Sequence, residues 1–233
     1  MNVKKCVVVI VLFIFAITNS FVAFGSSKND THIEMKTGFE VEGYDNPDLE
    51  AFSSRIKLKL LSSDCNGRID NYDVNENGEI VVAFNTISTE KKVCVYNSLG
   101  QFQYGYSLMD FGTIGVEWDG DNIIVYSVRS DYLILLDRKA NVLDKKKVLN
   151  TPANNTYSHK ILWETQREAG SHTYQLKTSK IIKNDTDGNE SIIVDKSGAY
   201  YFHLVIIVLF VAFSVIEFTI VMIKMLKKRS ICK

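Results

Sequence analysis

The pattern of apolar and polar positions divides the chain into three parts. Long apolar runs lie near both ends, at 6–24 and 202–223. Between them, apolar residues come in short or alternating runs that Gly, Asn and Asp interrupt. Such runs are typical of β-strands joined by turns, whereas an apolar run of about 20 residues is long enough to cross a bilayer as a helix. We therefore predict an all-β middle region between two hydrophobic segments.

The middle region contains a series of candidate strands, each rich in Val, Ile, Leu, Tyr or Phe. They are 55–61, 79–84, 92–97, 101–108, 122–128, 132–137, 142–149, 159–165, 173–179 and 191–195. The segment 46–52 instead predicts a short helix, because Asn46 can cap it and Pro47 suits its first position.

An internal repeat organises these strands. Residues 75–108 and 117–149 each contain a turn glycine, a strand, a polar gap, a second strand, a tight turn and a third strand. Gly78 of the first copy aligns with Gly120 of the second. A weaker third copy lies at 170–195. We expect the aligned glycines to occupy equivalent turns in successive sheets.

The tight turn of the repeat carries a recognisable motif. The segment 93–102 reads VCVYNSLGQF, and 133–142 reads LILLDRKANV. In these segments Asn97 aligns with Asp137, and Asn141 stands where glycine is usual; Asn tolerates positive φ, so the turn can be kept. The motif resembles NHL-type and related bacterial β-propeller repeats.

The resemblance implies an all-β fold of propeller-like repeated antiparallel sheets. It covers residues 69–149 well and 170–195 weakly. Closed propellers have about four to eight blades, and at roughly 40–45 residues per blade the segment 26–199 holds about four at most. The sequence therefore leaves open whether the sheets close into a ring.

Basic residues border the outer side of each long apolar run. They are Lys4, Lys5, Lys224, Lys227, Lys228, Arg229 and Lys233. The segment 26–199 has the opposite balance, with 20 Lys and Arg against 26 Asp and Glu. Because basic flanks stay in the cytoplasm, we expect 26–199 to lie outside the cytoplasmic membrane.

This pattern predicts the division of the chain. Residues 1–25 are a signal peptide, with Ala23–Gly25 as the small-residue cleavage site, or an uncleaved N-terminal anchor. Residues 26–199 form an extracytoplasmic domain, 200–226 a C-terminal transmembrane helix and 227–233 a short basic cytoplasmic tail. The chain crosses the membrane once or twice, depending on cleavage.

The stretch Asp73–Gly78 begins like a calcium-binding EF-hand loop, D-x-N-x-N-G. An EF-hand loop needs a bidentate acid at its twelfth position, which is Phe84 here, and helices on both sides. We interpret the stretch as a turn between strands, which uses Asn and Gly for their backbone freedom.

A search for catalytic or metal-binding chemistry gives few candidates. The sequence has no nucleophile elbow, phosphate loop, dinucleotide fingerprint or zinc motif. We therefore predict no enzyme activity, no cofactor and no metal, and no nucleic-acid partner. Cys65 and Cys94 are the cysteines of the outward domain, and they form either a disulfide or buried thiols.

Glu217 lies inside the second apolar run, and Ser214 is on the same face of the predicted helix. An intramembrane carboxylate is costly and marks a functional position by default. We predict that Glu217, with Ser214, contacts another helix; the alternative is a protonated or partly exposed Glu near the interface.

These features favour a membrane-anchored extracytoplasmic binding module of unknown ligand. Its expected partners are the lipid bilayer and another membrane or cell-surface protein. One alternative is a structural subunit that completes its β-sheet with a partner in a membrane complex. Another is a cell-surface hydrolase or lyase whose carboxylates come together only in the folded chain.

Overall fold

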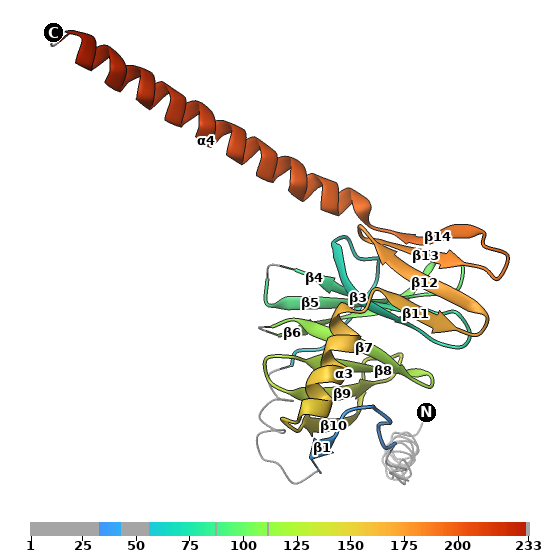
Figure 1. The fold of residues 1–233 in the computed structure, drawn as a ribbon. Helices are drawn as coiled ribbons and strands as arrows, with labels where there is room; N and C mark the ends of the chain where they lie inside the picture. The colour runs from blue at the N-terminus through green and yellow to red at the C-terminus, as the bar shows by residue number, and fades with distance from the viewer. Residues whose placement is uncertain (1–32, 43–55, 87, 111, 232–233) are drawn as a thin grey trace, which may run out of the picture. The chain divides into compact units, whose positions relative to one another are not determined.

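The structure, a computed structural model, describes residues 33–42, 56–86, 88–110 and 112–231 (Figure 1). These residues form antiparallel sheets and two helices, so the domain is mostly β. The first sheet contains β2 (Lys59–Leu61), β3 (Arg68–Val74), β4 (Ile80–Asn85), β5 (Glu90–Tyr96) and β6 (Phe102–Met109). The second contains β1 (Val41–Glu42), β7 (Ile114–Asp119), β8 (Asn122–Ser127), β9 (Tyr132–Leu136) and β10 (Val142–Val148). The third contains β11 (Gln166–Ala169), β12 (His172–Lys177), β13 (Lys180–Asn184) and β14 (Glu190–Asp195). The helices are α3 (Pro152–Trp163) and α4 (Ser197–Ile231).

Each sheet is built on a meander of four consecutive antiparallel strands. The meanders are β3–β6, β7–β10 and β11–β14. The short strand β2 pairs with β6, and β1 pairs with β10. The repeat unit is therefore one strand longer than the sequence repeat, because the aligned segments began three residues before the turn glycine and left out all or half of the strand before it.

The turn between the first and second strands recurs in all three meanders. It contains Gly78, Gly120 and Gly170, with φ of 75°, 59° and 59°. Positive φ strains most side chains, so glycine is favoured at such turns. The predicted equivalence of Gly78 and Gly120 is confirmed in strand order and direction, and the weaker third copy follows the same pattern.

The turn between the third and fourth strands recurs as well. Its positive-φ residues are Gly100 (77°), Ala140 (65°) and Gly188 (79°). The prediction that Asn141 takes the glycine position is wrong. The N–H of Ala140 donates to the Asp137 carbonyl (3.1 Å), and this bond fixes positive φ three residues after the acid. Asn141 is the next residue, and its N–H donates to the Asp137 side chain (2.8 Å).

The first sheet lies between the other two. On one face, Tyr72 belongs to a buried cluster with Tyr174 of the third sheet. On the other face, Val95 belongs to a cluster with Val125 of the second sheet. Face-to-face packing of successive meanders is the arrangement of propeller blades, and both faces of the middle sheet are apolar for that reason.

The outer face of the second sheet is covered by other parts of the chain. Tyr126 and Leu135 pack there with Phe39, from the segment before β1, and with Ile161 of α3. Among the described residues, none of the three apolar clusters joins the second sheet to the third. In the described part of the chain, the second and third sheets are thus linked by α3 rather than by a further sheet.

The helix α3 corrects the predicted strand 159–165. Thr151 caps the helix by accepting a hydrogen bond from the Asn154 N–H (3.2 Å), and Pro152 stands in the first turn. These start signals lie well before the apolar residues that suggested a strand, and they set the helical register through Trp163.

The other predicted strands correspond to β2, β4, β5, β6, β8, β9, β10, β12 and β14, although β2 begins only at Lys59. The strands β1, β3, β7, β11 and β13 were not predicted. The predicted segments 1–25 and 46–52 lie outside the described residues.

The C-terminal helix α4 follows β14 directly. Asp195 accepts hydrogen bonds from the N–H (2.9 Å) and the hydroxyl (2.6 Å) of Ser197 at the start of the helix. No helical stretch whose side chains the structure describes is both long and apolar enough to qualify as a membrane span.

Candidate functional site

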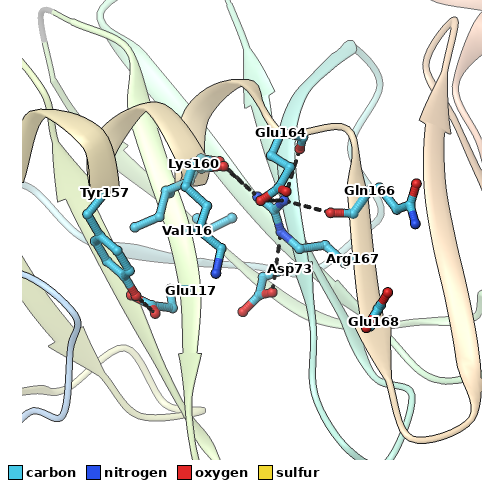
Figure 2. Close-up of a pocket in the computed structure, with 10 residues that line it drawn as sticks. Asp73, Val116, Glu117, Tyr157, Lys160, Glu164, Gln166, Arg167 and Glu168 are labelled. Atoms are coloured by element: carbon cyan, nitrogen blue, oxygen red, sulfur yellow. Dashed lines mark hydrogen bonds and ion pairs between the residues drawn. The ribbon is translucent and has the colours of Figure 1, made fainter.

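A pocket lies where β3, β7 and β11, the first strands of the three meanders, meet α3 (Figure 2). Its volume is about 630 Å³, within the range of small-molecule sites. The lining residues are Asp73 (β3), Val116 and Glu117 (β7), Tyr157, Lys160 and Ile161 (α3), Glu164, and Gln166, Arg167 and Glu168 (β11). The meander repeat thus places one strand of each sheet at a single polar site.

Asp73 connects the first and second sheets at the pocket. Its Oδ2 accepts a hydrogen bond from the backbone N–H of Trp118 (2.9 Å), at the edge of β7. Its Oδ1 lies 3.7 Å from Nε of Arg167. Burial raises the pKa of Asp73, although the Trp118 N–H and the Arg167 charge act in the opposite direction. The carboxyl is therefore part of the structure and also less acidic than an exposed Asp.

Glu117 is the second buried carboxyl of the pocket. Its Oε1 accepts a short hydrogen bond from the hydroxyl of Tyr157 on α3. Its Oε2 is buried and has no hydrogen-bond partner among the described residues. Burial raises the pKa of Glu117 above its usual value, and the negative charge of Asp73 acts in the same direction. Burial also raises the pKa of Tyr157, and the hydrogen bond to Glu117 acts in the same direction.

Arg167 fixes the end of α3 against the sheets. Its guanidinium donates to the backbone carbonyls of Lys160 (3.1 Å), Ile161 (3.1 Å) and Glu164 (3.0 Å). It also faces Asp73, as Figure 2 shows. Carbonyls at a helix end lack their full set of partners within the helix, although that of Lys160 also accepts the Glu164 N–H (3.2 Å). A cation there also complements the helix dipole. Arg167 therefore has a structural role, and its donors are largely used.

Lys160 has a different environment. Figure 2 shows its side chain extending from α3 toward the space between Glu117 and Asp73. Its charge lowers the pKa of both carboxyls, against the larger effect of burial. No ion pair within 4.0 Å involves its ammonium group in the described part of the chain. Lys160 is exposed, so its ammonium group is free to move.

The arrangement can bind and can exchange protons. Two carboxyls of raised pKa, a tyrosine hydroxyl and a lysine line one cavity, with Val116 and Ile161 as an apolar wall. Groups with shifted pKa values in a cleft are common at functional sites. Within the described residues, no group of three His, Cys, Asp or Glu side chains has the spacing to hold a metal ion.

Sequence reasoning did not identify this pocket. Of its residues, Asp73 was noted only as the start of the EF-hand-like stretch. The signal was a charged residue in the strand before each turn glycine: Asp73, Glu117 and Arg167. The EF-hand-like stretch itself is a turn, in which the side chain of Asn75 accepts from the N–H of Glu79 (2.9 Å).

The structure joins Cys65 and Cys94 by a disulfide, far along the chain from the pocket residues of α3. Cys94 pairs with Gly105 on β6, where a Cβ atom would lie 3.2 Å from the Cys94 sulfur. The neighbouring Asp64 accepts from the Tyr96 hydroxyl (2.5 Å) and forms an ion pair with Lys196 (2.7 Å), just before α4.

Glu217 and Ser214 lie on α4, and neither approaches the pocket lining. The Ser214 hydroxyl donates to the Phe210 carbonyl one turn earlier (2.9 Å). The side chain of Glu217 is exposed. The predicted contact of Glu217 with another helix stays a prediction.

Comparisons with known proteins give little more. No family model matches the chain, and no curated protein matches it. A crystal structure of selenomethionine-substituted virginiamycin B lyase from Staphylococcus aureus is similar at 13% identity and a TM-score of 0.24. The match covers 61% of this chain and 47% of the lyase, so the chain spans about half the length of that protein. The TM-score is too low for the fold or activity of the lyase to be carried over.

Proposed function

We propose that the chain is a membrane-anchored, extracytoplasmic binding module, and that its ligand site is the pocket between α3 and the strands β3, β7 and β11. The observation that carries the proposal is the pocket itself. It has the volume of a ligand site, an apolar wall, and polar groups that come from four separate elements. Convergence of polar groups on one cavity is the usual basis of ligand orientation.

The membrane anchor rests on the sequence of 202–223 and on the basic residues that follow it. A feature of α4 supports it. Large apolar side chains are exposed along the helix from Leu204 to Phe218, with exposed fractions of 46–73%. A contiguous apolar surface of this kind needs a membrane or a protein partner. The outer side of the membrane is also an oxidising compartment, in which the disulfide of Cys65 and Cys94 would persist.

Ligand-observed NMR on the full chain in lipid nanodiscs tests the binding function. The probes are n-pentylamine, pentanoate, 1-pentanol and glucose, which differ in charge and polarity. Gln166→Trp should block the pocket because Gln166 is exposed at its rim, whereas Lys177→Trp adds the same ring at an exposed position on β12. We expect at least one probe to bind and only Gln166→Trp to abolish its binding. Absence of binding by all four probes, or equal loss in both variants, would overturn the proposal.

A hydrolase or lyase is the second candidate, because the pocket brings together Asp73, Glu117 and Tyr157. Buried carboxyls of raised pKa are candidates for general acids or bases. However, Asp73 and Glu117 each already hold a structural hydrogen bond. Binding therefore needs fewer assumptions than catalysis.

A structural subunit that completes a sheet is the third candidate. In the described residues, β14 is the outer strand of the third sheet, so its outer edge is open to another strand. The ladder shifts register between Ile181 and Ile182, and such irregularities hinder edge pairing. Assignment of the meanders to NHL-type propeller blades also stays a proposal, which the recurring turns at Gly100 and Gly188 support.

A further inference from the structure

We propose that the pocket is a site for an alkylammonium group, and that the ammonium group of Lys160, which extends toward this site, competes with the ligand for it. The inference rests on the proposed binding function and adds the chemical class of the ligand. It also assigns Lys160 the role of an internal competitor.

The charges of the lining favour a cation. Four carboxyl groups and two basic groups surround the cavity. They are Asp73, Glu117, Glu164 and Glu168 against Lys160 and Arg167. A cavity with an excess of carboxyl groups concentrates cations and disfavours anions.

Arg167 does not provide an anion site. Its donors bind the carbonyls at the end of α3 and the Gln166 carbonyl (2.9 Å), and it also forms ion pairs with Asp73 (3.7 Å) and Glu164 (3.4 Å). Its side chain is 12% exposed. An incoming carboxylate would have to displace several of these bonds, and this makes an anionic ligand unfavourable.

Lys160 marks the place of the cation. Its side chain extends toward the space between Glu117 and Asp73 (Figure 2), and its charge acts on both carboxyls. The ammonium group forms no ion pair within 4.0 Å among the residues that the structure describes. A long-range, exposed interaction of this kind is weak, so a ligand cation can replace it at low cost.

The apolar wall selects an alkyl stem. Val116 and Ile161 border the same cavity as the carboxyls. An ammonium on a short hydrocarbon chain would place its charge between Asp73 and Glu117 and its stem against these two side chains. A free diamine and a lysine side chain share this chemistry, and the test distinguishes them.

Three variants of the full chain in nanodiscs provide the test, with n-pentylamine, 1-pentanol and pentanoate as probes. Lys160→Met keeps the alkyl stem and removes the competing charge, so n-pentylamine should bind about three- to tenfold more tightly. Glu117→Gln should weaken n-pentylamine about tenfold and leave 1-pentanol nearly unchanged. Lys177→Met, the same substitution at an exposed site outside the pocket, should change neither affinity.

The source of the ligand is read from two further probes. A capped Gly-Lys-Gly peptide that binds more tightly than 1,5-diaminopentane indicates a lysine side chain, and the reverse order indicates a free diamine. The matching Gly-norleucine-Gly peptide is the neutral control.

The outcomes separate this inference from the proposed function. Binding of pentanoate or glucose at the pocket, without n-pentylamine, would keep the binding module and overturn the cation site. Weaker n-pentylamine binding by Lys160→Met would show that Lys160 contributes a contact rather than competition. Circular dichroism, together with a thiol assay that shows the Cys65–Cys94 disulfide has formed, checks that each variant is folded. Failure of all probes in folded protein overturns both proposals.

Discussion

Asp73 accepts the backbone N–H of Trp118 at 2.9 Å, so a side chain of the first sheet satisfies a donor at the edge of the second sheet. Asn71 does the same two residues earlier, since its Oδ1 accepts the Val116 N–H at 3.1 Å. The edge of β7 is therefore paired by side chains rather than by another strand. This explains how successive meanders can lie face to face without exposing unpaired strand edges at the pocket.

Removal of the Asp73 acceptor should destabilise the domain. Asp73→Ala leaves the Trp118 N–H without a partner, and we expect a loss of roughly 1–3 kcal/mol in the free energy of unfolding. Asp73→Asn keeps an acceptor of the same shape and should lose less. Urea unfolding monitored by near-UV circular dichroism measures both. Equal losses for Ala and Asn would mean that the charge of Asp73, rather than the hydrogen bond, stabilises the contact.

The carboxyl of Glu117 should make stability depend on pH. Burial raises its pKa above 4.5, so between 4.5 and the raised pKa the folded chain binds more protons than the unfolded chain. The contribution of Glu117 to the free energy of unfolding therefore falls as pH rises through this window. The groups that face Glu117 are Tyr157, Lys160, Asp73 and Asp119.

Glu117→Gln should remove this pH dependence. At pH 7 the variant should be more stable than the parent, by about 1.4 kcal/mol for each unit by which the pKa is raised. Glu190→Gln, at an exposed position on β14, is the matched control and should leave the profile unchanged. Thermal unfolding from pH 4 to pH 8 gives the comparison. A stability difference between Glu117→Gln and the parent that shrinks as pH rises through the window would contradict the assigned direction.

Features of the fold that depend on a residue and its immediate neighbours could be predicted from the sequence. The turns at Gly78 and Gly120 were predictable because positive φ is a property of the residue and its immediate neighbours. The helix α3 was missed because its signals, Thr151 and Pro152, precede a segment with few apolar residues. Apolar residues at 161–163 then suggested a strand.

The pocket could not be predicted in the same way. Asp73, Glu117 and Lys160 are far apart in the sequence, and only the packing of the meanders and α3 brings them together. Each residue also has an ordinary local explanation, as a turn or an exposed helix position. Burial gives the two carboxyls their raised pKa values, and burial depends on the whole domain.

Two glycines in equivalent turns of the first and third meanders separate backbone strain from steric contact. Gly100 and Gly188 have nearly equal φ, 77° and 79°. A Cβ atom at Gly100 would lie 1.9 Å from the carbonyl oxygen of Ile193, whereas nothing lies within 4 Å at Gly188. Gly188→Ala should cost about 1 kcal/mol from positive φ alone, and Gly100→Ala should cost clearly more. Equal losses in urea unfolding would show that β14 moves freely away from the turn.

The disulfide of Cys65 and Cys94 should contribute substantially to stability. It closes a loop with a sequence separation of 29, for which the chain-entropy model gives about 3–4 kcal/mol. Replacement of both cysteines by Ser should lower the free energy of unfolding by that order. Reduction of the parent with dithiothreitol should give a similar loss, and should have no effect on the double variant. A loss in the double variant under dithiothreitol would indicate an unrelated effect of the reagent.

Glu217 lies two helical turns before Lys224, so its side chain cannot easily reach the basic edge of the apolar segment. In hydrocarbon, a carboxyl takes up a proton or finds a donor, and a protonated Glu can donate to a neighbouring helix. Ser214 is on the same face, and its oxygen can accept although its proton is bound to the Phe210 carbonyl.

On the proposal that α4 spans the membrane beside another helix, Glu217→Leu should weaken that association by about 0.6–2 kcal/mol and leave insertion intact. Phe218→Leu, one position along the helix, is the control, since it changes an exposed apolar side chain without removing a polar group. Cross-linking in bilayers across a range of protein-to-lipid ratios measures association. If cross-linking of Glu217→Leu and of the parent depends on the protein-to-lipid ratio in the same way, Glu217 has no role in association. Its place in the apolar segment would then be explained by proximity to the membrane interface.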